Sequence, residues 1–139
     1  MNVLVYAARQ DVVDHERYRE WLDATLASDE PFGFATIVLS GFVRVVTHPR
    51  IFQVPSSVST ALTFVDAIQA VPNAVLIEPG PRHWSLFERL CLAGAARGNL
   101  VADAYLAALA IESGCEWITT DRDFARFSGL RWRHPFDLR

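Results

Sequence analysis

Lysine is absent from this chain of 139 residues, because all thirteen basic residues are arginine. The absence excludes chemistry that needs a lysine amine: the phosphate-binding loop with its lysine, Schiff-base catalysis and lysine-activated nucleophiles. Cysteine is scarce as well. Cys91 and Cys115 are too few for a disulfide framework and lack metal-binding spacing, so we expect two free thiols in the core.

Long apolar runs are also missing. The apolar stretches are interrupted well short of the ~20 residues that span a bilayer, and the N-terminus lacks the basic region and cleavage site of a signal peptide. We therefore expect a cytoplasmic protein with no membrane partner. The formal net charge of -3 argues against a generic polyanion binder, because non-specific affinity for nucleic acid comes mostly from basic side chains that neutralise phosphates.

Charge is distributed unevenly along the chain. Acids are concentrated near the N-terminus, and arginines are concentrated at the C-terminal end, where the sequence has Arg122, Arg126, Arg131, Arg133 and Arg139. These arginines could form a basic flank beside an acidic site, or they could be an ordinary solvated surface. The sequence leaves both interpretations open.

Alternating helical and apolar segments predict an α/β fold over residues 1–139, as one three-layer α/β/α domain. Helices would cover both faces of a short central parallel sheet of four to five strands. The β-branched, apolar run at residues 2–8 is typical of a strand buried on both faces. Further strands are expected at 74–77, 116–119 and 130–133, and helices at 15–28, 35–47, 56–70, 84–96 and 100–113.

Three acids fall at positions that such a sheet would bring together. Asp103 is expected in the first turn of the 100–113 helix, and Asp121 and Asp123 follow the 116–119 strand. Ligands of open parallel sheets bind at the carboxyl ends of the strands, and clustered carboxylates repel unless a cation or shared proton offsets them. A hard divalent metal held by these acids is the economical interpretation. Taken singly, Asp103 could merely favour a helix dipole and Asp121 could merely cap a brief helix through Phe127.

Several segments resemble a known family. They are the opening Asn2-Val-Leu-Val-Tyr-Ala, residues 38–50, the Asp103-Ala-Tyr-Leu-Ala-Ala-Leu-Ala helix and the run Ile118-Thr-Thr-Asp-Arg-Asp-Phe. Together they look like a PIN-domain ribonuclease, a toxin of the VapC type. The resemblance covers essentially the whole chain, and its most specific part pairs the Asp103 helix with the Thr-Thr-Asp-x-Asp-Phe strand end.

The resemblance implies a function. It is that of a Mg²⁺-dependent endoribonuclease, the toxin of a type II toxin-antitoxin system, which hydrolyses RNA and is held inactive by a cognate antitoxin. A homodimer is implied as well. Asp103, Asp121 and Asp123 would bind Mg²⁺ or Mn²⁺, and Thr120 and Asn2 would be polar groups of the catalytic site that orient the acids.

The sequence departs from the family pattern in two places. The usual first acid would fall immediately before Met1, and the usual glutamate of the second helix aligns near Gly41. An alternative is therefore a catalytically impaired PIN-fold module that binds antitoxin or RNA without cleaving. A phosphate-signalling receiver domain also collects carboxylates at a sheet edge, but it needs a lysine.

The remaining titratable residues lack ligand spacing. We expect the four histidines on the surface or in loops, and the helical acids Glu88 and Glu112 on solvated faces.

Overall fold

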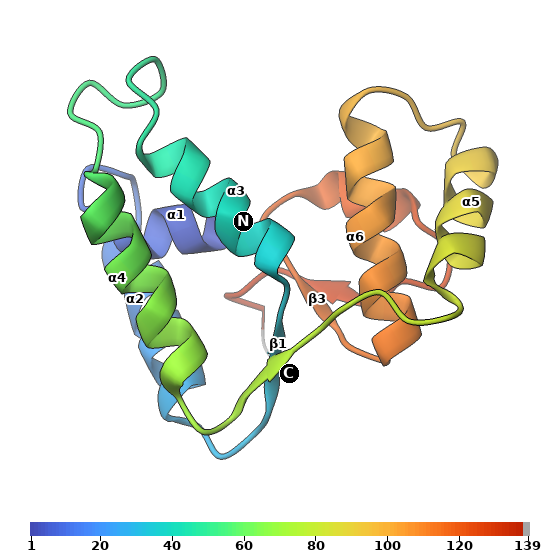
Figure 1. The fold of residues 1–139 in the computed structure, drawn as a ribbon, viewed down its shortest axis with the longest axis horizontal. Helices are drawn as coiled ribbons and strands as arrows, with labels where there is room; N and C mark the ends of the chain where they lie inside the picture. The colour runs from blue at the N-terminus through green and yellow to red at the C-terminus, as the bar shows by residue number, and fades with distance from the viewer. Residues whose placement is uncertain (138–139) are drawn as a thin grey trace. The chain divides into compact units, whose positions relative to one another are not determined.

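The computed structural model describes residues 1–137, so Arg139 of the basic flank lies outside the described residues. Helices and short strands alternate along the chain (Figure 1), which confirms the α/β class. The chain divides into two compact units, Met1–Leu76 and Ile77–Arg139, and each is described by itself.

The first unit contains four helices and one pair of strands within its described residues. In order these are α1 (Asn2–Ala8), α2 (His15–Ala27), β1 (Phe32–Phe34), α3 (Thr36–Val46), α4 (Val58–Ala70) and β2 (Ala74–Leu76). β1 and β2 are parallel, with Gly33 opposite Val75. Buried side chains of α1, α3 and α4 form the core of this unit: Val5, Leu39, Phe42, Val46, Ala61 and Val65. The helices predicted at 15–28, 35–47 and 56–70 and the strand at 74–77 are confirmed.

The N-terminal segment is a helix, so the strand predicted at residues 2–8 is wrong. The amide of Val5 donates to the carbonyl of Met1 at 3.2 Å, and the amide of Arg9 donates to the carbonyl of Val5 at 3.0 Å. Periodicity alone cannot distinguish a short apolar run in a buried strand from one in a buried helix. α1 packs against α2 and α3. Because its backbone groups form hydrogen bonds within the helix, the segment can be buried without pairing with a neighbouring strand.

The second unit is built on a helical hairpin of α5 (His83–Ala93) and α6 (Asn99–Ser113), which lie side by side in Figure 1. It continues with β3 (Trp117–Ile118), the 3₁₀ helix η1 (Arg122–Arg126) and β4 (Trp132–Arg133). Gly114 ends α6 with a left-handed φ of 71°, a conformation that glycine adopts without steric cost. The core combines small and aromatic side chains: Leu90, Ala104, Ala107, Ala108, Phe124 and Phe127. The helices and strands predicted for this region are confirmed.

The strands of residues 1–137 form two separate two-stranded parallel sheets, β1 with β2 and β3 with β4. The predicted central sheet of four to five strands is therefore not observed. One reason is that the expected strand at 2–8 is helical. Another is that β3 and β4 are only two residues long and pair over Trp117–Trp132 and Ile118–Arg133 alone.

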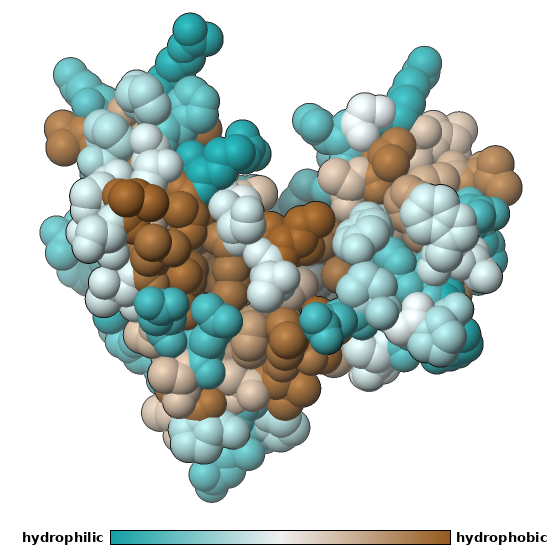
Figure 2. All heavy atoms as spheres, in the orientation of Figure 1, coloured by the Kyte–Doolittle hydropathy of each residue, from teal (hydrophilic) through white to brown (hydrophobic). Residues whose placement is uncertain are grey.

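Some large apolar side chains remain on the surface of both units, as Figure 2 shows for the face drawn there. Val54 and Val58 are exposed in the first unit, and Trp84 and Leu92 in the second. Within the described part of the chain, none of the helices combines the length and apolarity needed to cross a membrane.

The first unit should depend strongly on Phe42, which is 1% exposed and stacks on Phe64 with ring centroids 5.0 Å apart. We expect Phe42→Ala to lower the free energy of unfolding by about 3 to 5 kcal/mol, because it leaves a cavity in the core. Ile37→Ala on the same helix is the control; its side chain is 55% exposed, so its effect should stay near 0.5 kcal/mol. Equal effects in urea denaturation would contradict this account of the core.

Candidate functional site

Asp103 lies on α6, one turn beyond the start of the helix. The helix begins at Asn99 and has no acidic residue in its first turn, so the predicted first-turn position is wrong. The helix dipole acts on charges mainly within the first turn. A favourable dipole therefore does not explain an acid at this position.

Asp121 ends the turn that connects β3 to η1, and Asp123 lies in the first turn of η1. Asp121 caps η1, because its Oδ1 accepts a hydrogen bond of 2.9 Å from the amide of Asp123. The amide of Asp121 in turn donates to Oγ1 of the buried Thr119 at 3.0 Å. The capping role considered for Asp121 is thus confirmed, and it fixes the two acids relative to one another.

The charges of Asp121 and Asp123 act on Asp103. Asp103 is half-buried, and its pKa is raised first by burial and then by the negative charges of Asp121 and Asp123. The positive charge of Arg126 acts in the opposite direction. In the second unit, the negative charges of Asp121 and Asp123 therefore disfavour the ionised form of Asp103.

Carboxylate oxygens are the ligands that Mg²⁺ and Mn²⁺ prefer, and a cation would offset the repulsion at Asp103. Within residues 1–137, however, no three side chains of Asp, Glu, His or Cys are arranged to hold one metal ion together. One oxygen of Asp121 already serves as a helix cap. The donor chemistry fits a hard cation, and Mg²⁺ usually keeps several of its waters, through which a carboxylate can be bound indirectly.

The two polar residues predicted to orient the acids have different surroundings. Thr120 is half-buried between Thr119 and Asp121, but the contact that orients Asp121 is made by Thr119. Asn2 is exposed on α1 in the first unit, whereas the acids belong to the second. Roles of Thr120 and Asn2 at the acids stay predictions.

The arginines of the C-terminal end are not all free surface charges. Arg131 donates to the carbonyl of Gly114 at 2.9 Å, and Arg133 forms a 3.0 Å ion pair with Glu116. These two arginines hold β4 and the residue before it against the end of α6 and the start of β3. Arg126 instead donates from Nε to the carbonyl of Asp123 at 3.2 Å.

Sequence reasoning missed two polar residues that join α5 to α6. Glu112 accepts hydrogen bonds from the amides of Gly80 at 2.7 Å and Arg82 at 2.8 Å, so it is not simply solvated. His83 is 3% exposed, and its Nε2 bonds the carbonyl of Tyr105 at 3.0 Å, so a surface position is wrong for this histidine. No local pattern marks either residue, because each partner lies more than 20 residues away in the chain.

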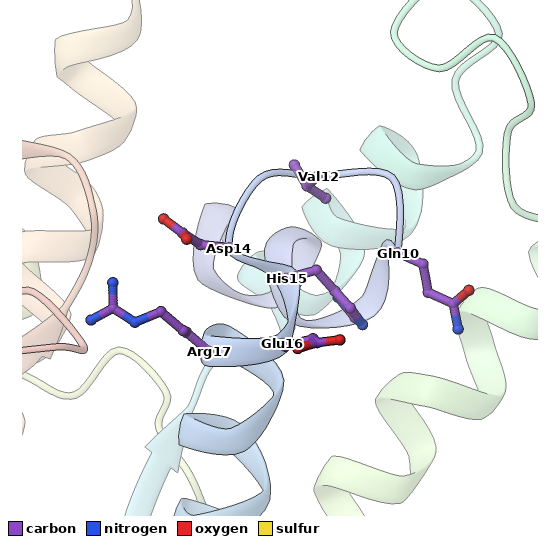
Figure 3. Close-up of a pocket in the computed structure, with 6 residues that line it drawn as sticks. All are labelled: Gln10, Val12, Asp14, His15, Glu16 and Arg17. Carbon is purple, nitrogen blue, oxygen red and sulfur yellow. The ribbon is translucent and has the colours of Figure 1, made fainter.

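A surface cavity of about 640 Å³ lies in the first unit at the turn between α1 and α2, and none of the residues predicted for the site lines it. In Figure 3 the side chains of Asp14 and Arg17 point to one side of the turn and that of Gln10 to the other. They do not converge on a common ligand. The lining residues are Gln10, Val12, Asp14, His15, Glu16 and Arg17.

Comparison with known proteins places this arrangement in a family. The family model for the PIN domain matches residues 1–130. Ribonuclease VapC43 of Mycobacterium tuberculosis is 49% identical over 137 residues, covering 99% of this chain and 93% of the relative. Ribonuclease VapC25 of the same organism is 42% identical over 135 residues, covering 97% of this chain and 95% of the relative. The chain therefore belongs to the PIN-domain family, among the VapC ribonucleases.

A solved structure shares the fold. The crystal structure of VapBC2 from Rickettsia felis bound to a DNA fragment from their promoter contains a similar chain, with a TM-score of 0.68. The match covers 96% of this chain and 93% of the other at 19% sequence identity.

The ionised carboxylate of Asp103 should lower the stability of the metal-free protein near neutral pH. Because the folded-state pKa of Asp103 is raised above its ordinary value of 3.8, ionisation removes stability as the pH rises from that value through the folded pKa. We expect Asp103→Asn to melt at a temperature equal to or above that of the unaltered protein at pH 7 in EDTA. The difference should disappear below about pH 4. Asp66→Asn, at an exposed position of α4, is the control, and a much lower Tm for Asp103→Asn would show that Asp103 is structural.

Glu112 should stabilise the second unit in the opposite pH range. Its pKa lies below the ordinary value of 4.5, chiefly because the amide of Gly80 donates to its carboxylate. The stabilisation is therefore complete above about pH 4.5 and is lost as the pH falls through the folded pKa. We expect Glu112→Gln to lower the Tm at pH 7, and by progressively less toward pH 3. Glu88→Gln on the exposed side of α5 should change little; a constant deficit at every pH would contradict a role for the charge.

Proposed function

We propose that this protein is the endoribonuclease toxin of a type II toxin-antitoxin pair, hydrolysing RNA phosphodiester bonds with the help of Mg²⁺ or Mn²⁺. The observation that carries the proposal is the electrostatic effect of Asp121 and Asp123 on the half-buried Asp103. It occurs in a chain 49% identical to a protein named as a ribonuclease. A compact domain gains nothing in stability from acids that repel each other, so another use of them is the simplest explanation.

The three acids would hold the metal ion, Asp123 directly or through a water molecule. Bound there, the ion would lower the pKa of a water and offset charge on the phosphate. The chain itself contributes a fixed arrangement of acids. The Thr119 hydroxyl and the Asp121 cap hold the turn after β3, so the carboxylates need little reorganisation when substrate arrives.

A cognate antitoxin protein is the expected partner, and the similar chain from Rickettsia felis was solved as VapBC2. The exposed apolar side chains of both units give surface that a protein partner or a second copy could cover. We propose a homodimer on the same ground. The family match to residues 1–130 includes residues of both units, which supports one PIN domain.

The alternative function is a PIN-fold module that binds antitoxin or RNA without cleaving it. Two observations favour it: no three potential ligands are grouped within residues 1–137, and Asp121 already has a structural task. Gly41 adds a third, because it has no carboxylate at the position where the family pattern has an acid.

Two substitutions of Asp121 separate the capping role from the proposed metal role. Asp121→Asn keeps an oxygen that can accept from the amide of Asp123, whereas Asp121→Ala removes it and should cost about 0.5 to 2 kcal/mol. Both remove the charge, so both should lower Mn²⁺-dependent cleavage of a fluorescent RNA. We expect about a hundred-fold loss or more, since even the outer partners of metal ligands typically cost about 10- to 100-fold. Asp66→Asn, exposed on α4, should cleave normally.

Titration calorimetry with Mn²⁺ and cleavage assays with and without EDTA decide between the two functions. The enzyme should bind Mn²⁺, and EDTA should stop cleavage. A protein that binds RNA, fails to bind Mn²⁺ and leaves the RNA intact is the non-cleaving module.

A further inference from the structure

Arg126 lies in η1, the short helix that Asp121 caps, and its position is fixed by a single main-chain contact. Its Nε donates to the carbonyl of Asp123 at 3.2 Å. An arginine side chain has five N–H donors in a planar fork, and Nε carries only one of them. The terminal nitrogens therefore remain available while the group is held beside the acidic turn.

No carboxylate neutralises Arg126 in the described part of the chain. The ion pairs found there join Arg9 to Asp11, Arg19 to Asp23 and Arg133 to Glu116. Arg126 is exposed, and its hydrogen bond to the carbonyl of Asp123 holds the start of the guanidinium at the main chain of an acidic residue. The guanidinium thus lies beside Asp123 without an ion pair to a carboxylate among the described residues.

The other arginines of this unit differ from Arg126 in this respect. Arg131 and Arg133 hold the β3–β4 region together, and Arg82 donates to the carbonyl of Glu112. Arg122 lies on the same short helix and is exposed, but within residues 1–137 no hydrogen bond or ion pair holds its side chain in place. Arg126 alone, among the described arginines of this unit, combines a fixed position, free terminal donors and closeness to the acids.

We propose that Arg126 binds a phosphate of the RNA chain beside Asp103, Asp121 and Asp123 and so positions the strand at the acids. The inference rests on the proposed function for its substrate class. A guanidinium suits the task because two parallel N–H groups can donate to two phosphate oxygens, a geometry that lysine cannot reproduce. The contact would also bring positive charge to the phosphate in a chain whose formal net charge is -3.

The test measures RNA binding separately from cleavage. Asp121→Asn serves as the background, because it keeps the cap, weakens the repulsion of phosphate and removes the charge needed for metal. In EDTA, the affinity for a labelled single-stranded RNA is measured by fluorescence anisotropy at several salt concentrations, with Arg126→Ala, Arg126→Lys or Arg122→Ala added. A bidentate charged contact is worth about ten-fold or more in affinity, so Arg126→Ala should weaken binding by that factor. It should also reduce the salt slope by about 0.7.

Arg126→Lys should recover the salt slope but only part of the affinity, and Arg122→Ala should match the background in affinity. Without the Asp121 substitution, Arg126→Ala should raise KM for RNA more than it lowers kcat. A change in Tm alone, with unchanged affinity and slope, would overturn the inference and leave the nuclease intact. If the unaltered chain fails to cleave RNA while Arg126→Ala still weakens its binding, the proposed nuclease fails and the phosphate contact stands.

Discussion

The repulsion that Asp103 experiences from Asp121 and Asp123 is the constraint on which the proposed activity depends. The carboxylates are carried by elements whose stability has other sources: α6 packs its alanines against α5 and against Phe124 and Phe127. Because that apolar packing holds the helix and the turn in place, the acids can stay close despite the cost to the ionised form of Asp103. Natural proteins accept such conflicts mainly at functional sites, where a ligand relieves them.

The turn after β3 combines structure and chemistry in very few residues. The side chains of Thr119 and Asp121 accept hydrogen bonds from the amides of Asp121 and Asp123. The same Asp121 side chain contributes a negative charge that acts on Asp103. Arg126 is tied to the main chain of Asp123, in the first turn of η1. Acid and base are therefore held by one short segment, so their relative positions do not depend on long flexible side chains alone.

Local signals in the sequence were sufficient for most elements of the second unit. Gly114 ends α6 in the left-handed conformation that glycine favours, and Asp121 caps η1 as its side chain allows. Residues 2–8 show where such signals fail. The run is apolar on nearly every side, so its period carries no information, and packing against α2 and α3 determines that it is helical. The predicted central sheet of four to five strands is not observed partly for the same reason, because one of its expected strands is this helix.

The sequence by itself determined the α/β class and most helix boundaries and marked the three acids as candidates, because caps, breakers and the Thr-Thr-Asp-x-Asp-Phe run act over a few neighbouring residues. Only the tertiary structure decided that Thr119 orients Asp121, that Glu112 joins α6 to the start of α5, that His83 is buried and that Arg126 stays unpaired. Burial and electrostatic proximity depend on which distant segments pack together, and no local pattern encodes those contacts.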